Sequence, residues 1–471
     1  MPLLNFTRER NTNIAFLLLI ILLLVPVTYF LDMFGNKATA QAVLIGLPAI
    51  LIGFVNFKVA IFVFITSLFF DIFPLLLIHI GILLIPYLVL AFMLTSKGFK
   101  FQDLKTPFTF VIIIFALSLL PSLLNSRALT NSMLNMLTWP SFLLLVILLA
   151  VSLREMKKIN FVTALYVGIV TLNSFYCIYQ GITTGRRSFG FAGVMFVDIL
   201  GISIVITFIL FMVAKGEKKI WLGMIFLIQI LASIFTKTRN VWINILLVLL
   251  LSLIHIIIKS EYLQINKKKI IRYGLISIGG VALIGGLLIS YFGAGFFRLE
   301  NKQELTQESL EVGDVSNSLV TRYFIWTTGY NGFLQNPVTG IGIYSFGYSS
   351  QFYNTLPEVL FKKFVAGLTL HHGYFAILVE AGIVGFTGLM VFLIIIFRRS
   401  RKIYTEAQGT EYFLPSFIAF WVLIYIYISL FFSDAWYWGR GILIFAVVLG
   451  VISALNHLIL DVKKEEKSIE Q

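Results

Sequence analysis

The sequence predicts an all-α integral membrane protein, and three observations support this fold class. Of the 471 residues, 59% are hydrophobic and only 12% are charged. The hydrophobic residues come in runs of about 20, the length that an α-helix needs to cross the hydrocarbon core of a bilayer. The runs lack the polar and apolar alternation of membrane β-strands. We therefore predict one polytopic helical domain over residues 1–471.

Fourteen apolar segments are candidate spans, and we expect about 12–14 of them to cross the membrane. The third segment is short, so it is either re-entrant or continuous with its neighbour. The segments are 13–31, 39–56, 59–72, 76–95, 107–125, 135–153, 159–181, 191–214, 219–236, 239–258, 270–292, 368–397, 412–431 and 439–459.

The distribution of lysine and arginine predicts the orientation of these spans. With the N-terminus inside, the cytoplasmic segments are all basic and hold 24 of the 36 lysines and arginines. The positive-inside rule therefore places both termini in the cytoplasm. The net charge of +14 is then explained by topology and by contact with anionic membrane lipids. It does not indicate a nucleic-acid partner.

The few cations on the predicted outer face need a separate reason. Arg186 and Arg187 follow the seventh segment, and Arg239 lies in the tight turn between the ninth and tenth. Arg322 belongs to residues 293–367, one long extracytoplasmic loop between the eleventh and twelfth candidate spans. A connection of this length in a compact domain is usually functional or disordered.

His371 and His372 follow this loop and add a group that exchanges protons near neutral pH. Arginine offers a planar fork of donors that suits phosphate oxygens. Together these side chains would suit a lipid-linked diphosphate that reacts at the outer face. Successive helical residues differ by about 100°, so only one of the two histidines easily faces a common cleft.

Two carboxylates near the outer ends of spans are candidate supports for this site. Asp198 could pair with an arginine, tune the base or simply lie at the interface. Glu380 follows His371 by nine residues, about half a turn round a regular helix. We therefore expect Glu380 to be a structural partner of another helix.

The stretch "HHGYFAILVEAGIVGF" resembles the signature of the O-antigen ligase and polymerase family. In this resemblance His371 takes the place of the family histidine, followed by Tyr374, Glu380 and Gly382. His372 stands where the family has asparagine, which leaves the choice between the two histidines open. Asp198 likewise replaces an expected asparagine. The resemblance covers roughly residues 180–400, with three further matching stretches: "RRSFGFAGVMFVDILG", "FTKTRNVWINILLVLLL" and "TRYFIWTTGYNGFLQNPVTGIGIYSFG".

The resemblance implies a glycosyltransferase of the bacterial cytoplasmic (inner) membrane, with its active site on the outer face. Such an enzyme transfers glycans from undecaprenyl diphosphate to an acceptor glycan or lipid, without a metal or other cofactor. Carried over, Arg187 and Arg239 hold the donor diphosphate, with Arg186 and Arg322 as further candidates. His371 would deprotonate or orient the acceptor hydroxyl, with His372 as its alternative. A flippase and a chain-length regulator are the implied protein partners.

Several functions remain open at this point. We expect a polymerase of surface-polysaccharide repeats, for capsule, O-antigen or lipopolysaccharide. The alternative is a ligase that transfers a finished glycan to a lipid or protein. A flippase or transporter of lipid-linked sugars would favour ionisable residues near the membrane midplane, whereas the candidate groups here gather on one face. A non-catalytic scaffold would not need Arg239 or His371. With a single cysteine and scattered remaining histidines, the sequence predicts no metal site.

Overall fold

The computed structural model describes residues 105–274, 279–280, 318–434 and 439–469. The described residues belong to one compact unit. The first four predicted spans and most of the eleventh lie outside the described residues. The single domain over 1–471 therefore stays a prediction.

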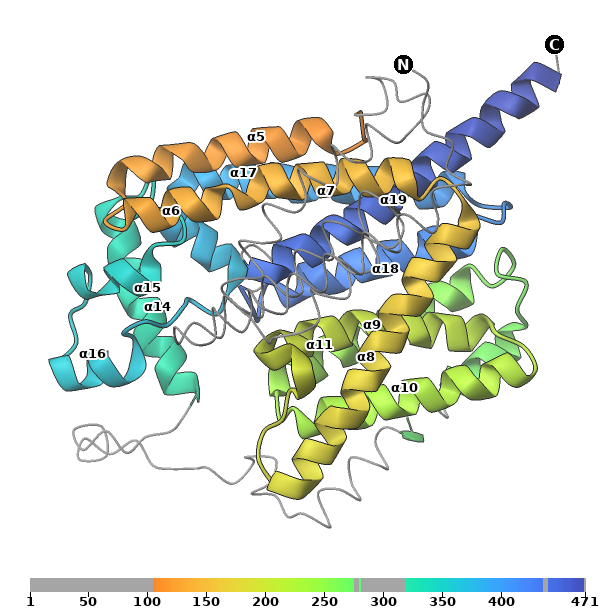
Figure 1. The fold of residues 1–471 in the computed structure, drawn as a ribbon, viewed down its shortest axis with the longest axis horizontal. Coiled ribbons are helices and arrows are strands. Elements are labelled where there is room, and N and C mark those ends of the chain that lie inside the picture. Colours follow the sequence, from red (N-terminus) through yellow and green to blue (C-terminus); the bar gives the residue numbers. More distant parts are fainter. Residues whose placement is uncertain (1–104, 275–278, 281–317, 435–438, 470–471) are drawn as a thin grey trace, which may run out of the picture. The chain divides into compact units, whose positions relative to one another are not determined.

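The described residues fold into α-helices and short 3-10 turns (Figure 1). The 3-10 turns are η2 (Leu120–Asn125), η3 (Gly190–Met195) and η5 (Ser350–Phe352). The α-helices are α5 (Thr109–Leu119), α6 (Leu129–Met136), α7 (Thr138–Ser152), α8 (Met156–Thr184), α9 (Phe196–Val213), α10 (Glu217–Phe235), α11 (Arg239–Ile258), α14 (Ser318–Gln335), α15 (Phe346–Ser349), α16 (Glu358–Phe364), α17 (Gly373–Glu406), α18 (Phe413–Ser429) and α19 (Gly439–Ile469).

Seven helical segments in this part of the chain are long and apolar enough to cross a membrane. They are Leu129–Ser152, Met156–Thr184, Gly190–Val213, Glu217–Phe235, Arg239–Ile258, Gly373–Glu406 and Gly441–Glu466, and two shorter apolar segments are Thr109–Asn125 and Phe413–Ser429. Each overlaps a predicted span, so the all-helical membrane fold is confirmed for the described residues. The total of 12–14 spans stays a prediction.

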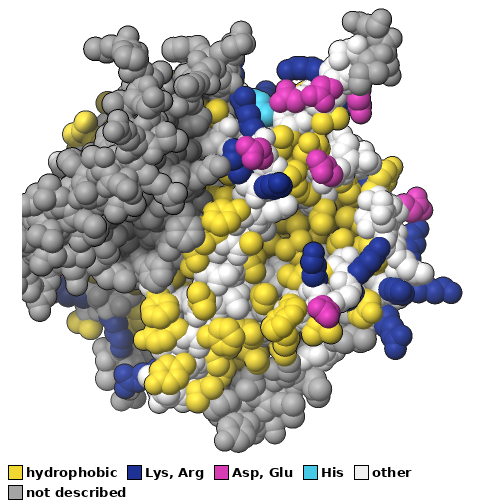
Figure 2. All heavy atoms as spheres, turned by 45° about the vertical axis from the view of Figure 1, so that its right-hand side comes forward, with side chains coloured by type: hydrophobic (Ala, Val, Ile, Leu, Met, Phe, Trp, Pro, Cys, Tyr) yellow, Lys and Arg dark blue, Asp and Glu magenta, His cyan; other side chains and the backbone are white. Residues whose placement is uncertain are grey.

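Helix α9 lies at the centre of one group of helices, because it packs against α8, α10, α11 and α18. Nearly all of its side chains are buried. In a second group, α7 packs along α19, and α5 packs along α17. Figure 2 shows one face of the molecule, on which hydrophobic side chains form a broad surface and most charged side chains lie around it. Such a surface is what a lipid-facing helix bundle presents.

The described part of the predicted long loop is largely helical. It contains α14, α15 and α16, which lie at the same end of the unit as the start of α17 (Figure 1). Helix α14 packs against both α16 and α17. Residues 318–367, which we call the cover segment, therefore fold against one end of the other helices. The aromatic and glycine-rich composition of this segment predicts that it is folded.

Helix α17 bends at Gly382, where φ is +64° and the regular helix is interrupted. Residues 337–342 run beside the bend and bond to it through their backbone. The N–H groups of Ile341 and Gly342 donate to the carbonyls of Val379 and Glu380, at 3.1 and 3.0 Å. The N–H of Ile383 in turn donates to Pro337 at 2.9 Å. The bend and the loop thus satisfy each other's backbone groups, which a buried backbone requires.

Two glycines permit this close approach. A Cβ at Gly340 would lie 2.3 Å from the carbonyl oxygen of Glu380, and one at Gly382 would lie 2.3 Å from that of Val338. Neither gap admits a side chain. The Gly-x-Gly element (residues 340–342) and the Glu-x-Gly element (residues 380–382) therefore pack directly against each other. We call this contact the joint, and it sets the direction of the first turns of α17.

Candidate active site

The two histidines have different backbone conformations at the start of α17. His371 is left-handed, with φ of +52°, and its N–H donates to Oδ2 of Asp434 at 3.0 Å. Its Nδ1 lies 3.2 Å from the hydroxyl of Thr369. His372 is the N-cap of α17, and its Nδ1 accepts the N–H of Phe375 at 3.2 Å. The left-handed residue, rather than a helical step, separates the two imidazoles.

The capping bond determines the protonation state of His372. Because Nδ1 accepts a hydrogen bond, the neutral ring carries its proton on Nε2. Burial lowers the pKa of His372, and the charge of Arg322 lowers it further, with Asp434 acting in the opposite direction. The ring of Trp326 packs edge-on to His372 with 5.8 Å between ring centroids. The Nε1–H of Trp326 donates to the carbonyl of Leu370 at 2.9 Å. His372 is therefore held as a neutral capping group.

Asp434 is part of this cluster, although the residues predicted from the sequence do not include it. Its side chain is 6% exposed, it accepts the N–H of His371, and it interacts electrostatically with Arg322 and His372. A buried carboxylate is costly unless it is paired or hydrogen-bonded. The sequence signal for Asp434 is a carboxylate that follows the end of an apolar helix.

Arg322 connects the cover segment to the start of α11. With its amide oriented to match its neighbours, Asn240 accepts hydrogen bonds from both terminal nitrogens of Arg322, the Nη1 contact being 3.1 Å. Burial lowers the pKa of Arg322 and Asp434 opposes this shift, but a guanidinium stays charged at physiological pH. The neighbouring Arg239 is exposed and is the first residue of α11. Asn240 was not predicted as a site residue, and its position directly after Arg239 is the only signal for it.

Arg187 links the turn between α8 and α9 to the turn between α10 and α11 through hydrogen bonds. Its Nε donates to the carbonyl of Thr236 at 3.0 Å and its Nη2 to the hydroxyl of Thr238 at 2.8 Å. The guanidinium also lies 4.6 Å from the ring centre of Phe189. The turn between α8 and α9 is thereby held against the turn that precedes Arg239. Arg186 is exposed beside it.

These contacts place the predicted cations and histidines in one connected region. Arg187 touches Thr238, which directly precedes Arg239, and Arg322 joins the start of α11 to the cluster around His372. The region brings together α8, α11, α14 and α17, which are far apart in the sequence. Its predicted residues line neither of two cavities of about 840 and 910 Å³ elsewhere in the described unit.

Asp198 lies beside the cluster and holds the end of α18. Its carboxylate accepts hydrogen bonds from Ser429 at 3.0 Å and from Ser433 at 3.4 Å. The carbonyl of Ser433 accepts the N–H of Gly373 at 3.2 Å. Through these bonds Asp198 supports the segment on which α17 begins.

Glu380 does not reach the histidines. Its two carboxylate oxygens accept the N–H groups of Tyr344 and Phe346, both at 2.9 Å. Tyr344 has a left-handed backbone with φ of +58°, so the carboxylate stabilises a strained turn just before α15. Glu380 therefore belongs to the joint at the bend of α17.

Among the residues that the structure describes, no group of three or more His, Cys, Asp or Glu side chains is arranged to hold a metal ion. Metal independence stays a prediction.

The helices define a multi-pass α-helical membrane protein with a cationic and histidine-containing region at one end. Residues 202–390 match the family model described as O-Antigen ligase. This match confirms the resemblance to the O-antigen ligase family that the sequence predicts. This range includes Arg239, Arg322, His371 and Glu380. No curated protein matches the chain.

Proposed function

We propose that this protein is a glycosyltransferase that polymerises undecaprenyl-diphosphate-linked repeats on the outer face of the bacterial cytoplasmic membrane. The observation that carries the proposal is the position of Arg322, which bonds Asn240 at the start of α11 and acts electrostatically on His372 at the start of α17. It links the cationic end of α11 to the histidine pair. A donor diphosphate and an acceptor hydroxyl need such an arrangement.

Arg239 and the first turn of α11 are the proposed diphosphate site. The dipole at a helix N-terminus favours an anion, and the guanidinium of Arg239 adds a full positive charge. Arg322 supplies a second guanidinium close by. Arg187 positions the turn before Arg239 and, with the exposed Arg186, contributes to the same positive field.

His371 is the proposed general base. Its Nδ1 lies near the hydroxyl of Thr369, and Nε2 makes no hydrogen bond to another described residue. The acceptor hydroxyl oxygen attacks the anomeric carbon of the donor, and the bond from that carbon to the diphosphate oxygen breaks. The hydroxyl proton passes to His371, and undecaprenyl diphosphate leaves with the bonding electron pair. Arginines near the departing oxygens stabilise their developing charge.

A ligase is the second candidate, because the matching family model carries that description. The same residues would transfer a finished glycan to a lipid or protein acceptor, with identical chemistry at the anomeric carbon. For either reaction, both termini are proposed to lie in the cytoplasm and the site on the opposite face, a topology that the basic segments support through the positive-inside rule. A flippase and a chain-length regulator remain the proposed protein partners.

Purified protein supplied with synthetic undecaprenyl-diphosphate repeats tests the proposal. Stepwise ladders of product indicate a polymerase, and a single block transfer to an added acceptor indicates a ligase. We expect Arg239→Ala to lower kcat/KM by about 10²–10³, the usual effect of removing one group that stabilises transition-state charge. His371→Ala should abolish base catalysis, a loss of about 10²–10⁴.

The matched control is Lys362→Ala, which removes an exposed cation on α16 that pairs with Glu358 at the surface. It should leave turnover within about twofold. Equal activity of the wild type, His371→Ala and Arg239→Ala, all correctly folded, would refute the site. Translocation of the lipid without any new glycosidic bond would identify a flippase instead.

A further inference from the structure

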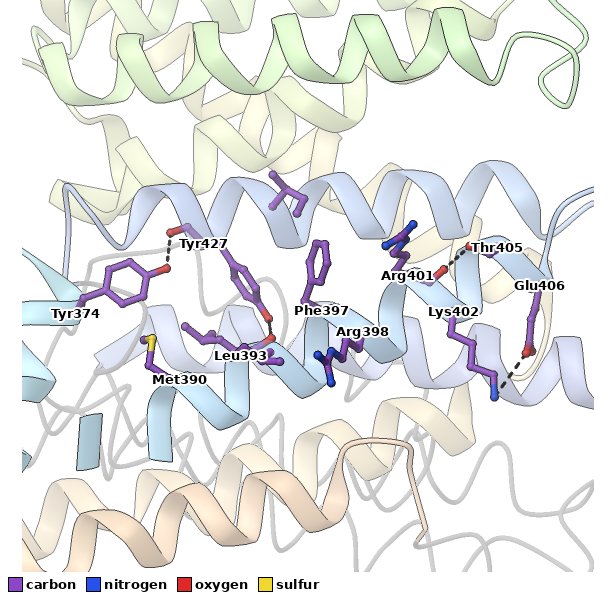
Figure 3. A pocket seen from close by; sticks show the side chains of 12 residues that line it. Tyr374, Met390, Leu393, Phe397, Arg398, Arg401, Lys402, Thr405, Glu406 and Tyr427 are labelled. Carbon is purple, nitrogen blue, oxygen red and sulfur yellow. Dashed lines mark hydrogen bonds and ion pairs between the residues drawn. The ribbon is translucent and has the colours of Figure 1, made fainter. Parts of the chain in front are cut away.

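A groove of about 840 Å³ runs along α17 after its bend, and α18 forms its second wall (Figure 3). One stretch of the groove is apolar, and its lining includes Met390, Leu393, Ile394, Phe397 and Ile424. Ile394 is 49% exposed although it is hydrophobic. The groove is therefore a hydrophobic surface that opens away from the helix core.

The groove ends in a cluster of cations. Arg398, Arg401 and Lys402 line that end, at relative positions i, i+3 and i+4 of the helix, which lie on one side of it. Lys402 is 3.7 Å from Glu406. Neither Arg398 nor Arg401 pairs with a carboxylate of the described residues, and both are exposed. Two guanidinium groups thus face the mouth of an apolar groove.

Glu406 does not neutralise this cluster, because it is shared with a second lysine. Lys463 of α19 lies 3.1 Å from its other carboxylate oxygen. The remaining polar side chain at this end, Thr405, donates its hydroxyl to the carbonyl of Arg401 at 2.7 Å. The basic end of the groove therefore keeps an excess of positive charge.

The opposite end of the groove is closed by two tyrosines. The hydroxyl of Tyr374 donates to the carbonyl of Tyr427 at 2.9 Å, and the hydroxyl of Tyr427 donates to the carbonyl of Leu393 at 2.7 Å (Figure 3). The twelve residues from Met390 to Arg401 are separated by eleven helical steps and span roughly 16 Å at about 1.5 Å per residue. This is about the depth of one leaflet of a hydrocarbon core roughly 30 Å thick.

We propose that this groove binds an anionic glycerophospholipid. Its phosphate contacts Arg398 and Arg401, and one acyl chain lies along Ile394, Leu393 and Phe397. Guanidinium groups bind phosphate oxygens in a bidentate manner, and basic pockets between membrane helices are sites for anionic headgroups. The groove reaches the start of α17 at Tyr374, but the proposed phosphate ligands Arg398 and Arg401 lie in the later part of that helix, and the proposal does not rest on the glycosyltransferase chemistry.

Native mass spectrometry of the purified full chain tests this site by titration with phosphatidylglycerol or with phosphatidylcholine of the same acyl chains. Phosphatidylglycerol should bind at least tenfold more tightly to the wild type. Each basic residue near an anionic lipid contributes roughly a fivefold factor, so Arg398→Gln with Arg401→Gln should weaken binding about thirtyfold. Ile394→Trp fills the groove and should weaken binding while all three cations remain.

The control is Arg399→Gln, which removes one guanidinium charge from the same helix. The Arg399 guanidinium bonds to the carbonyl of Pro107 and does not line the groove, so binding should stay within about twofold. Equal affinity for the two lipids, or equal loss in Arg399→Gln and the double variant, would overturn the site. Displacement of the lipid by millimolar inorganic phosphate would also overturn it, because the site would then bind a free anion.

Discussion

The backbone N–H of His371 donates a 3.0 Å hydrogen bond to Asp434, a residue 63 positions further along the chain. The acceptor is a buried carboxylate, and the donor belongs to a residue with an unusual left-handed backbone. One bond therefore fixes the turn that presents the proposed base. It also brings the connection between α18 and α19 into the same region as α11 and α14.

Asp434→Ala should lower kcat by about 10²-fold with little change in KM, because a base displaced by about 1 Å loses this much rate. Asp434→Asn keeps an oxygen that accepts the N–H of His371 and should recover much of the activity. Steady-state kinetics of the two variants measures the difference. Asp461→Asn, an exposed carboxylate on α19 that pairs with Lys464, is the control. If Asn and Ala at position 434 are equally impaired, the negative charge matters rather than the hydrogen bond.

His372→Asn should retain activity, because asparagine is an effective N-cap and can accept the N–H of Phe375. His372→Ala should lose about 1 kcal/mol of stability from the missing cap. In contrast, His371→Asn should be inactive. Turnover assays and thermal unfolding in detergent separate these outcomes. An inactive but well-folded His372→Asn would move the base to His372.

The pKa of His372 gives a pH dependence of stability. Burial lowers the pKa of His372 in the folded state, so the unfolded chain binds a proton at higher pH than the folded protein does. The contribution is fully present above the unfolded pKa of about 6.5 and is lost as pH falls through the lower folded pKa. Protonation also removes the acceptor for the Phe375 cap. Unfolding temperatures between pH 5 and 8 should show a smaller acid loss in His372→Asn than in the wild type.

Gly340→Ala should destabilise the protein much more than Gly367→Ala. Both glycines have a left-handed φ, +73° and +72°, which costs about 1–2 kcal/mol in any other residue. A Cβ at Gly340 would also meet backbone atoms of Glu380 at 2.3 Å, whereas nothing lies within 4 Å of one at Gly367. The difference in Tm between the two variants measures the cost of the clash with Glu380, because the backbone strain is common to both. Equal decreases in Tm would show that the backbone around Gly340 and Glu380 moves apart at little cost.

Membrane orientation is testable with thiol probes. The single cysteine of the sequence, Cys177, is fully buried, so the wild-type chain should not react with an impermeant maleimide. Lys362→Cys lies on α16 in the cover segment, and Lys215→Cys lies in the turn between α9 and α10. In intact spheroplasts the first should be labelled, and the second only after the membrane is permeabilised. The reverse pattern would invert the proposed topology.

The lengths and positions of the spans could be predicted because the apolar run itself determines them. The run 239–258 coincides with α11, Arg239–Ile258, and 191–214 differs little from the observed segment Gly190–Val213. The bend in α17 could not be predicted in this way. It depends on a loop whose backbone supplies donors at Ile341 and Gly342 and acceptors at Pro337 and Val338. Side-chain periodicity carries no information about such backbone groups.

The candidate site was predicted in its residue types and not in its contacts. Motif order indicated Arg239, Arg322 and His371, all within the family match. Asp434 and Asn240 were not predicted, because their contacts with His371 and Arg322 form only where separate helices meet. Arg187 was predicted as a phosphate ligand, yet one of its partners is the carbonyl of Thr236. Backbone acceptors are present at every residue, so no sequence pattern points to one of them.

The left-handed backbone of His371 implies that a residue which favours activity at this position lowers the thermal stability of the protein. A non-glycine residue in that conformation sacrifices roughly 1–2 kcal/mol, and glycine would adopt it without penalty. His371→Gly should therefore yield a protein that resists heat better than the wild type and transfers no sugar. Thermal unfolding and the transfer assay on this variant measure the two effects separately.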